Sequence, residues 1–217
     1  MSAPPGTAQE RTGGFGFYFF LSHSFFYRLS QKAVWSAFGH RFFNEFAAAR
    51  PGEKVLDIGC GPGDRLETLP DVDYTGFDLN SEYIAAAKQN HGTRARFFCG
   101  DVACMNFETE KGTFDLVLAH GMLHHVDDER VKQLFALAHS MLKEGGRLVT
   151  VDPCYTPGQS RASRWVVSHD RGRFVRETAR YLELAGSAFT KVDSVVRHDL
   201  LRVPYTQILL RCIKTQE

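Results

Sequence analysis

A glycine-rich turn and an acid that follows it are the residues of this sequence best suited to binding a ligand. Residues 55–63 read VLDIGCGPG, a short apolar run that contains Asp57 and ends in a turn with Gly59 and Gly61. Glycines let the backbone turn sharply and let a ligand approach where a Cβ atom would collide. Asp78 follows Gly59 by about 20 positions, the spacing of a carboxylate that accepts hydrogen bonds from both hydroxyls of a ribose.

The glycine turn alone leaves two classes of cofactor open, because nicotinamide-binding domains contain a similar turn. The dinucleotide motif requires a small residue where this sequence has Asp64, and a carboxylate at a helix N-terminus disfavours a pyrophosphate there. The same carboxylate suits a ligand with an ammonium or sulfonium group. The sequence also has no Tyr-x-x-x-Lys pair. A nicotinamide-dependent oxidoreductase is therefore the less favoured alternative.

Short β-branched runs alternate with helical segments after residue 50, which predicts βαβ units around a parallel sheet. We expect an α/β fold with a doubly wound, mostly parallel seven-stranded sheet that includes an antiparallel late strand. The predicted strands are Lys54–Ile58, Tyr74–Asp78, Ala95–Cys99, Phe114–Ala119, Arg147–Asp152, Lys191–Arg197 and Tyr205–Ile213. The predicted helices are Asp64–Leu69, Ser81–Asn90, Asp127–Leu142 and Arg176–Ala185.

A chain of 217 residues fits one domain with a single core. We predict a flexible tail at 1–14, an N-terminal helical lid at 15–50, and the main domain at 51–217. Within that domain, residues 153–174 interrupt the regular alternation after the fifth strand. Because ligands bind at the carboxyl ends of the strands in such sheets, we expect this insertion to face the substrate.

The predicted lid is rich in Phe and Tyr, but it does not read as a membrane span. Polar residues interrupt the stretch 15–29, which is shorter than the roughly 20 apolar residues that a span requires. The first residues also lack the pattern of a secretory signal. We expect the lid to cover the bound cofactor, with Tyr27 and Gln31 facing inward one helical turn apart. A docking helix or a dimer contact is the alternative.

The sequence resembles the class I S-adenosylmethionine-dependent methyltransferases, because three further motifs follow the glycine turn in the order found in that family. Residues 100–102 read GDV, residues 114–120 read FDLVLAH, and residues 142–149 read LKEGGRLV. The resemblance covers about residues 50–152. It implies S-adenosylmethionine as cofactor, S-adenosylhomocysteine as product, and methyl transfer as the activity.

The resemblance also assigns roles to single residues. Gly59 and Gly61 would contact the methionine moiety through their backbones, and Asp78 would bind the ribose. Leu79 and Val102 would enclose the adenine, with Asp101 accepting from its amino group. The alternatives are that Asp57 only orders the glycine turn and that the two apolar residues belong to the core. The full set of cofactor contacts implied is Asp57, Gly59, Cys60, Gly61, Asp78, Leu79, Asp101, Val102, Ala119 and His120, with Tyr27 and Gln31 from the lid.

Three histidines stand where an acceptor would meet the methyl group, at the end of the predicted fourth strand. His124 and His125 are the candidates for a general base that would deprotonate a hydroxyl acceptor. The alternative is that the pair serves packing and cofactor positioning. No set of acids accompanies the histidines, so we expect no metal.

The insertion is locally basic, with five arginines and one histidine between positions 161 and 176 and one opposing acid, Asp170. Arginine forks bind carboxylates and phosphates bidentately. Arg171 and Arg173, with His169, are the candidate substrate-binding residues, and Gly172 would let both arginines turn toward one anion. The alternative is a solvated loop whose arginines pair with surface acids.

The composition narrows the partners. Twenty-six Lys and Arg oppose 25 Asp and Glu, so the chain has no general basic field for nucleic acid, and no motif typical of DNA methylation follows the fourth strand. Five cysteines without paired spacing indicate a reducing, cytoplasmic location. We expect a small-molecule acceptor, methylated on O or N and favoured by the arginines to be anionic. A non-catalytic binder of the cofactor is the alternative, and the oligomeric state is left open.

Overall fold

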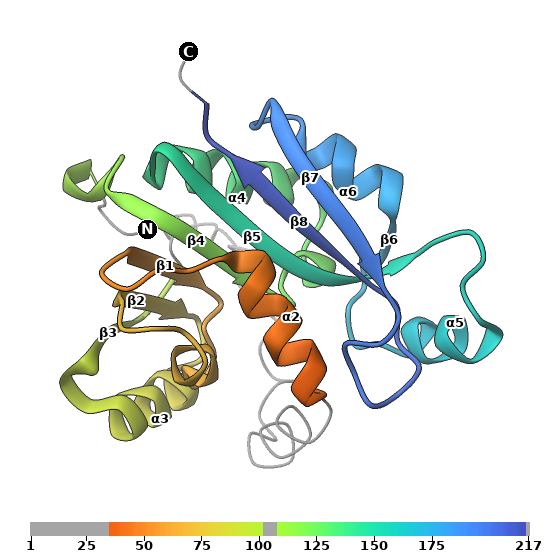
Figure 1. Ribbon diagram of the computed structural model, residues 1–217, viewed down its shortest axis with the longest axis horizontal. Helices are drawn as coiled ribbons and strands as arrows, with labels where there is room; N and C mark the ends of the chain where they lie inside the picture. The colour runs from red at the N-terminus through yellow and green to blue at the C-terminus, as the bar shows by residue number, and fades with distance from the viewer. Residues whose placement is uncertain (1–34, 102–107, 216–217) are drawn as a thin grey trace, which may run out of the picture.

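The computed structural model describes residues 35–101 and 108–215, whose strands form a central sheet (Figure 1). Seven of the described strands form one path in the order β3-β2-β1-β4-β5-β8-β7, and β6 pairs with the end of β5. Strand β8 runs antiparallel to both of its neighbours, β5 and β7, and the other pairs on this path are parallel. The strands are β1 (Lys54–Ile58), β2 (Asp73–Asp78), β3 (Ala95–Cys99), β4 (Phe114–His120), β5 (Leu142–Tyr155), β6 (Arg176–Glu177), β7 (Lys191–Arg197) and β8 (Gln207–Ile213).

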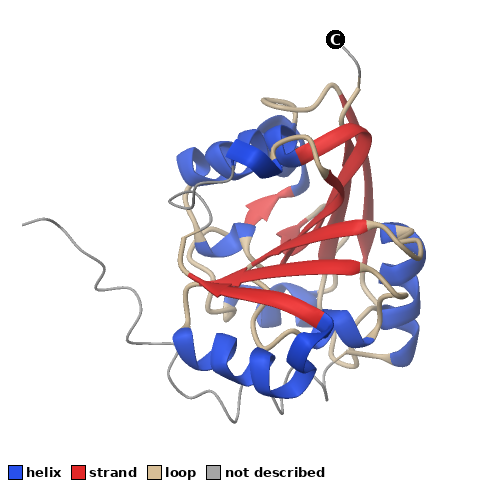
Figure 2. Cartoon of the chain, turned by 90° about the vertical axis from the view of Figure 1, so that its left-hand side faces the viewer, coloured by secondary structure: helices blue, strands red, loops and turns tan. Residues whose placement is uncertain are grey.

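Helices cover both faces of this sheet (Figure 2). Strand β4 shows why, since its side chains alternate between two buried clusters. Leu116 and Leu118 pack in the cluster that contains α2 and α3 residues, while Val117 and Ala119 pack in the cluster with α4 and α6 residues. The described helices are α2 (Ala37–Ala47), α3 (Ser81–His91), α4 (Asp128–Met141), α5 (Arg161–Ser168) and α6 (Thr178–Ala185), with 3₁₀ turns η2 (Asp64–Glu67), η3 (Gly92–Arg94), η5 (Glu108–Glu110) and η6 (Leu123–His125).

The predicted fold class is confirmed, including the antiparallel strand late in the chain. The order of strands reverses between β1 and β4, because the chain builds β2 and β3 outward on one side and then returns to place β4 on the other. Open α/β sheets bind ligands at such a point, outside the carboxyl ends of the strands.

The predicted helix at 64–69 is wrong in type, because the structure forms only the short 3₁₀ turn η2 there. Gly63 enters the turn with a left-handed φ of 81° and offers no side-chain cap. Pro70 follows soon after and disfavours helical backbone at the residue before it. The glycine turn therefore runs into a single tight turn rather than into a long helix.

The end of β5 and the start of α6 differ from the prediction because segments far apart in sequence pair with one another. Strand β5 extends to Tyr155, where Cys154 and Tyr155 pair in parallel with Arg176 and Glu177 of β6. The helix predicted from Arg176 consequently begins at Thr178. The insertion also contains an unpredicted helix, α5, whose N-cap Ser160 accepts a hydrogen bond from the Ser163 backbone.

Part of the predicted lid is a docked helix. Phe43 and Ala47 of α2 are fully buried in the cluster beneath the sheet. At its start, the Ser36 backbone and hydroxyl both donate to the Leu200 carbonyl, at 3.1 and 2.8 Å. Residues 1–34, which hold the predicted tail and the aromatic part of the lid, lie outside the described residues. The division into tail, lid and main domain stays a prediction.

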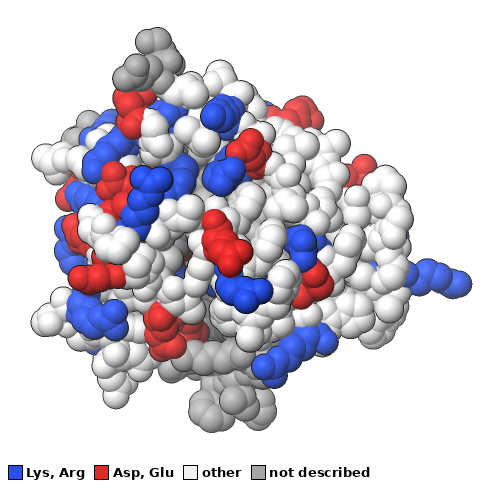
Figure 3. Space-filling view, viewed as in Figure 1, with Lys and Arg blue, Asp and Glu red and all other residues white. Residues whose placement is uncertain are grey.

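The surface carries both signs of charge. Lys and Arg side chains lie interspersed with Asp and Glu over the face shown in Figure 3. Within the described ranges, none of the helices has the length and apolar character needed to cross a bilayer.

Gly39 tests how closely α2 is docked. A Cβ atom at this position would lie 2.1 Å from the Leu200 carbonyl oxygen, which is backbone and cannot rotate away. We expect Gly39→Ala to lower the free energy of unfolding by about 1–3 kcal/mol or more, measured by urea denaturation.

Gly186→Ala is the matched control, because Gly186 has right-handed backbone angles and a Cβ there would lie 3.3 Å from the nearest atom, the Leu182 carbonyl oxygen. It should change the stability much less. Equal losses in the two variants would contradict close docking of α2.

Candidate active site

The glycine turn after β1 presents its backbone to the space beyond the carboxyl ends of the strands. The Gly59 and Cys60 amides donate to the Phe77 carbonyl at 2.8 and 2.9 Å, which ties the turn to β2. Gly61 has a left-handed φ of 56°, and a Cβ added there would meet nothing within 4 Å. The backbone at Gly61 is therefore open to an approaching ligand.

Asp78 connects the end of β2 to this turn. Its Oδ2 accepts from the Gly61 amide at 2.9 Å, and its Oδ1 accepts from the Asn80 amide at 2.8 Å. Burial raises the pKa of Asp78 above its ordinary value, although these backbone hydrogen bonds oppose the shift. The Leu79 backbone gives the carboxylate a third hydrogen bond, and since a carboxylate has about four lone-pair sites, Asp78 can still accept from a ligand.

Two other residues that were predicted to contact the cofactor, Leu79 and Asp101, follow strands β2 and β3. Leu79 is 38% exposed, unusual for a large apolar side chain directly after a buried strand. Asp101 is partly exposed, and its Oδ2 lies 3.8 Å from Nη1 of Arg130. Val102, Tyr27 and Gln31 lie outside the described residues.

Asp57 lies at the inner side of the glycine turn and is buried. Its Oδ2 accepts from the Tyr74 hydroxyl at 2.5 Å. Burial is the main cause that raises the pKa of Asp57 to about 6, against the hydrogen bond from Tyr74 and the charge of Arg65, which lower it. Cys60 is also buried, and burial raises the pKa of its thiol, so it is a neutral small side chain.

Arg65, which the sequence analysis did not single out, joins the end of β4 to this site. Its Nη2 donates to Nε2 of His120 at 2.6 Å, and its guanidinium lies 4.5 Å from the ring centroids of Trp35 and Phe43. Burial lowers the pKa of His120 well below its ordinary value, so its ring is neutral and can accept this bond. Ala119, the residue before it, is fully buried.

His124 is held between two carboxylates. Its Nδ1 donates to Oδ1 of Asp152 at 2.7 Å, and its Nε2 lies 3.3 Å from Oδ1 of Asp170. Burial alone would lower the pKa of His124, but the bonds to these two acids outweigh it and raise the pKa to about 9. The ring is therefore an imidazolium at neutral pH, with both nitrogens engaged.

His125 differs from its neighbour in charge. Its ring centroid lies 4.0 Å from that of His124. Burial, together with the positive charge of His124, lowers the pKa of His125 to about 4. His125 is neutral at physiological pH and is a weak base, so the general-base roles predicted for both histidines stay predictions.

Asp170 binds the insertion to this histidine. The Tyr205 hydroxyl donates to its Oδ2 at 2.5 Å, and the Gly172 amide donates to its Oδ1 at 2.7 Å. Although burial opposes the shift, the bonds from His124 and Tyr205 hold the pKa of Asp170 well below its usual range. Asp170, the one acid of the insertion, therefore serves to hold the insertion in place.

Gly172 was predicted to let the arginines on either side turn toward one anion, but in the structure it packs against His124. A Cβ there would lie 2.1 Å from Cδ2 of His124, so the glycine permits close packing against the imidazole. Arg171 and Arg173 on either side are exposed. Arg176 does not belong to the basic surface, because it is 7% exposed and donates to Asp128 and to the carbonyls of Leu123, Val126 and Phe174.

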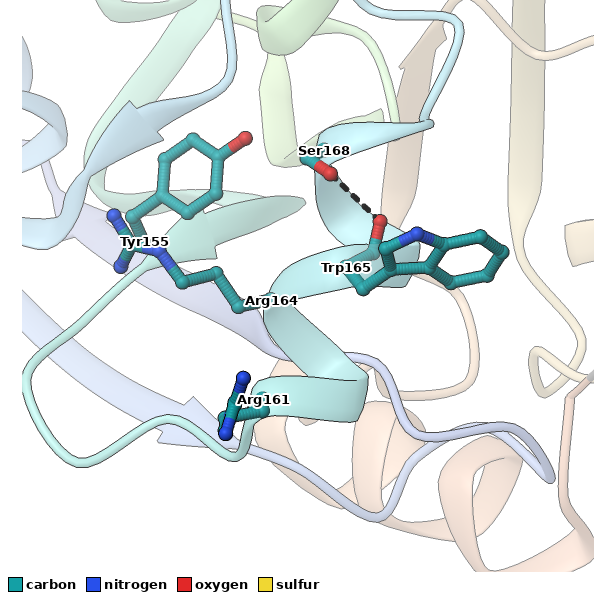
Figure 4. Close-up of a pocket in the computed structure, with 5 residues that line it drawn as sticks. All are labelled: Tyr155, Arg161, Arg164, Trp165 and Ser168. Atoms are coloured by element: carbon teal, nitrogen blue, oxygen red, sulfur yellow. Dashed lines mark hydrogen bonds between the residues drawn. The ribbon is translucent and has the colours of Figure 1, made fainter.

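The helix of the insertion borders a shallow hollow of about 420 Å³ (Figure 4). The Arg164 guanidinium lies 5.1 Å from the Tyr155 ring centroid, while Trp165 points away from it and is 64% exposed. His169, a predicted substrate contact, lies against Trp165, with ring centroids 4.5 Å apart and the ring planes tilted by 37°. The hollow is lined by Tyr155, Arg161, Arg164, Trp165 and Ser168.

Within residues 35–101 and 108–215, no group of three His, Cys, Asp or Glu side chains is arranged to hold a metal ion. The four described cysteines, Cys60, Cys99, Cys154 and Cys212, are unpaired.

Known proteins are similar to this chain in sequence. Residues 55–146 match a family model described as a methyltransferase domain. The chain is 27% identical over 162 residues to phosphoethanolamine N-methyltransferase 3 of Arabidopsis thaliana, an alignment that covers 72% of this chain and 33% of that protein. The chain thus spans about a third of that relative's length.

Solved structures share the fold. Phosphoethanolamine N-methyltransferase 2 of Haemonchus contortus, in complex with phosphomonomethylethanolamine and S-adenosylhomocysteine, superposes with a TM-score of 0.65 at 17% identity, covering 83% of this chain and 54% of that one. Geranyl diphosphate C-methyltransferase of Streptomyces coelicolor A3(2), in complex with Mg²⁺, geranyl diphosphate and S-adenosylhomocysteine, gives 0.63 at 18% identity, covering 81% and 77%. The predicted resemblance to class I methyltransferases is confirmed.

The charge on His124 predicts a pH dependence of stability. Its folded pKa of about 9 lies above the ordinary value of 6.5, so its contribution is fully present below pH 6.5 and is lost as pH rises through 9. Across that range we expect the stability of the wild type relative to His124→Asn to fall by about 2–3 kcal/mol, measured by urea denaturation at stepped pH.

Cysteine and tyrosine titrations occur in both proteins and cancel in this difference. A difference in stability that stays constant from pH 6.5 to 9 would show that His124 is not charged in the folded protein.

Proposed function

We propose that this protein transfers a methyl group from S-adenosylmethionine to a small-molecule acceptor, because residues 55–146 match a methyltransferase-domain model and the fold is shared with a solved methyltransferase. The reaction is an in-line displacement that leaves S-adenosylhomocysteine. We propose a cytoplasmic location, which the unpaired described cysteines support.

The observation that carries this proposal is the pairing of Asp78 with the open backbone at Gly61. A carboxylate that can still accept a hydrogen bond lies against a left-handed glycine that has room in front of it. The carboxylate suits a ribose diol, and the open backbone suits the chain that extends from the ribose. Leu79 is exposed beside Asp78 and would cover one face of the adenine, with Asp101 near its amino group.

The chain's own residues would contribute mainly by positioning. The cofactor supplies an activated methyl group on a sulfonium. Holding two reactants in line removes up to about 7–11 kcal/mol of the barrier, and no covalent enzyme intermediate is required. The glycine turn and Asp78 fix one reactant, while η6 and the insertion border the space for the other.

Among the two predicted bases, His124 is better suited to positioning. A charged ring with both nitrogens bound to carboxylates has no lone pair with which to accept a proton. His125 is neutral and retains that ability, although its low pKa makes it a weak base. An acceptor that needs no deprotonation by the enzyme would fit this site best.

We propose that the acceptor carries an anionic group and that the insertion binds it. Arg161 and Arg164 lie one helical turn apart at the hollow on α5, and the described part of this helix carries no acid. Two structural neighbours were solved with anionic ligands, phosphomonomethylethanolamine and geranyl diphosphate. Arg171 and Arg173, with His169, remain the second candidate set.

Asp78 provides the test of cofactor binding. Losing its carboxylate would leave two ribose hydroxyls without a charged acceptor, and a hydrogen bond to a charged group contributes about 1.5–3 kcal/mol. We expect Asp78→Ala to weaken S-adenosylmethionine binding at least about tenfold, measured by calorimetry.

Asp73→Ala is the matched control, because Asp73 begins the same strand at its other end and is exposed. It should leave binding unchanged. If the wild type binds NAD tightly and does not bind S-adenosylmethionine, the methyltransferase assignment fails. Binding without turnover of any acceptor would instead favour the non-catalytic alternative.

The arginines of the insertion can be tested against phosphorylated and carboxylated acceptors. We expect Arg161→Ala combined with Arg164→Ala to lower kcat/KM at least about tenfold and leave cofactor affinity unchanged, because only the acceptor loses contacts. The pair Arg171→Ala and Arg173→Ala is measured in the same assay. Arg94→Ala, before β3 at the opposite edge of the sheet, is the control. Equal kcat/KM for all variants would mean that these arginines belong to a solvated surface and do not bind the acceptor.

A further inference from the structure

Helix α5 of the insertion packs on the domain with its small side chains and presents its larger ones to solvent. Ser163 and Val167 are buried, and the Ser163 hydroxyl lies 2.6 Å from the Thr206 hydroxyl. The other side of the helix, which we call the α5 face, follows the spacing of successive helical turns. Its exposed residues are Arg161, Arg164, Trp165 and Ser168.

Trp165 is the largest apolar side chain of this helix, yet it lies on the solvent side. It is 64% exposed, and Figure 4 shows its ring directed away from Tyr155. Burial of an aromatic ring is one of the larger apolar contributions to stability, and the fold does not use it here. An indole has an apolar body and one N–H group, so it suits the boundary between an apolar phase and water.

The loop between β7 and β8 borders the α5 face and adds to its character. The Tyr205 hydroxyl donates to Oδ2 of Asp170 at 2.5 Å, which fastens the loop to the insertion. The same loop carries Arg202, which is exposed, and Val203, which is 40% exposed. Exposed apolar side chains therefore come from two segments that pack together, beyond the single ones that are normal on a protein surface.

The charge around the α5 face is positive, although the whole chain is nearly neutral. Residues 156–175 and 200–206 contain five arginines and one acid, Asp170. That acid is engaged with His124 and Tyr205, so its charge is directed inward. The arginines of these segments are Arg161, Arg164, Arg171, Arg173 and Arg202, all of them exposed. Such a local field attracts an anionic partner.

The mixture of groups favours a lipid bilayer over other anionic partners. Tryptophan concentrates at the membrane–water interface, and arginine can place its aliphatic stem there while its guanidinium meets the phosphates. A short helix with one apolar and cationic side can lie in the plane of that interface. A surface for nucleic acid relies on stacking with bases, to which an exposed aliphatic side chain such as Val203 contributes little.

We infer that the α5 face docks this protein onto the surface of an anionic lipid bilayer. Trp165 enters the headgroup region, and the surrounding arginines bind the lipid phosphates. Because the insertion is attached to the loop after β4 through Asp170, docking would turn the carboxyl ends of the strands toward the bilayer. The docking itself requires no methyl transfer.

Tryptophan fluorescence of the full chain can detect this docking directly. The chain has two tryptophans, and Trp35 is only 5% exposed, so a change in emission on docking reports on Trp165. With vesicles of equimolar phosphatidylglycerol and phosphatidylcholine, we expect the emission to shift to shorter wavelength. Lipids brominated on their acyl chains should quench it. Vesicles of phosphatidylcholine alone should produce much smaller changes, and added salt should weaken the binding.

Co-sedimentation with the same vesicles measures the contribution of each group. We expect Trp165→Ser to lower the partition coefficient about tenfold, because the indole no longer enters the interface. Arg171→Ala and Arg202→Ala should each lower it about fivefold, the effect of one cationic side chain near an anionic surface.

Two exposed residues elsewhere provide matched controls. Leu182→Ser removes an apolar side chain that is 37% exposed on α6, and Arg94→Ala removes an exposed arginine at the opposite edge of the sheet. Neither should change the partition coefficient. Thermal unfolding of each variant shows whether the protein that is sedimented is folded.

Three results would overturn the inference. The first is equal binding of the wild type to anionic and neutral vesicles, or no binding to either. The second is binding without a shift in Trp165 emission, which would mean that another surface docks. The third is retention on an immobilised oligonucleotide or acidic polypeptide without binding to vesicles, which would assign the basic surface to nucleic acid or protein. Failure to bind S-adenosylmethionine would contradict the proposed function and leave the docking intact.

Discussion

The elements that follow β1 and β4 pack on opposite faces of the sheet, and the rest of the structure depends on this divergence. Leu66 of η2 joins the buried cluster that contains α2 and α3 residues, whereas Val131 and Phe135 of α4 join the cluster on the other face. Because the chain leaves the two neighbouring strands in opposite directions, the space beyond their carboxyl ends stays open. The glycine turn, His120 and η6 all border that space.

Charged groups gather at this edge of the sheet, and some of them form a buried network around His124. Asp152 and Asp170 hold His124 between them, and Tyr205 donates to the second of these acids. Such a network costs desolvation energy, so its value lies in fixing geometry more than in adding stability. Here it fastens the insertion to the loop after β4, which places the hollow on α5 beside the same edge of the sheet.

Arg176 and Gly172 make this attachment possible in different ways. Arg176 donates four hydrogen bonds, to Asp128 and to three carbonyls, which satisfies backbone acceptors that the loops would otherwise leave unpaired. Gly172 has no side chain, so the loop can lie directly on the His124 ring. An insertion held at two such points can present arginines to a ligand with little loss of conformational entropy on binding.

The sequence determined the features that depend on neighbouring residues. Short runs rich in β-branched residues placed six of the seven principal strands within two residues of their ends, because such runs are a local signal. The positions of Gly61 and Asp78 followed from a motif in which the glycine turn follows one strand and the acid ends the next. Local patterns also gave the wrong type for η2, where Gly63 and Pro70 limit the turn.

Only the tertiary structure decided which distant residues meet. Arg65 lies 55 positions from His120, and no local pattern marks a lone arginine after a glycine turn as a partner of the fourth strand. The prediction for Gly172 considered its own loop, whereas the structure uses the glycine for contact with His124. Strand β6 likewise exists because Arg176 and Glu177 meet the end of β5. Side-chain spacing determines which face of an element is apolar, but the charge states and partners at the site depend on packing between segments that the sequence keeps far apart.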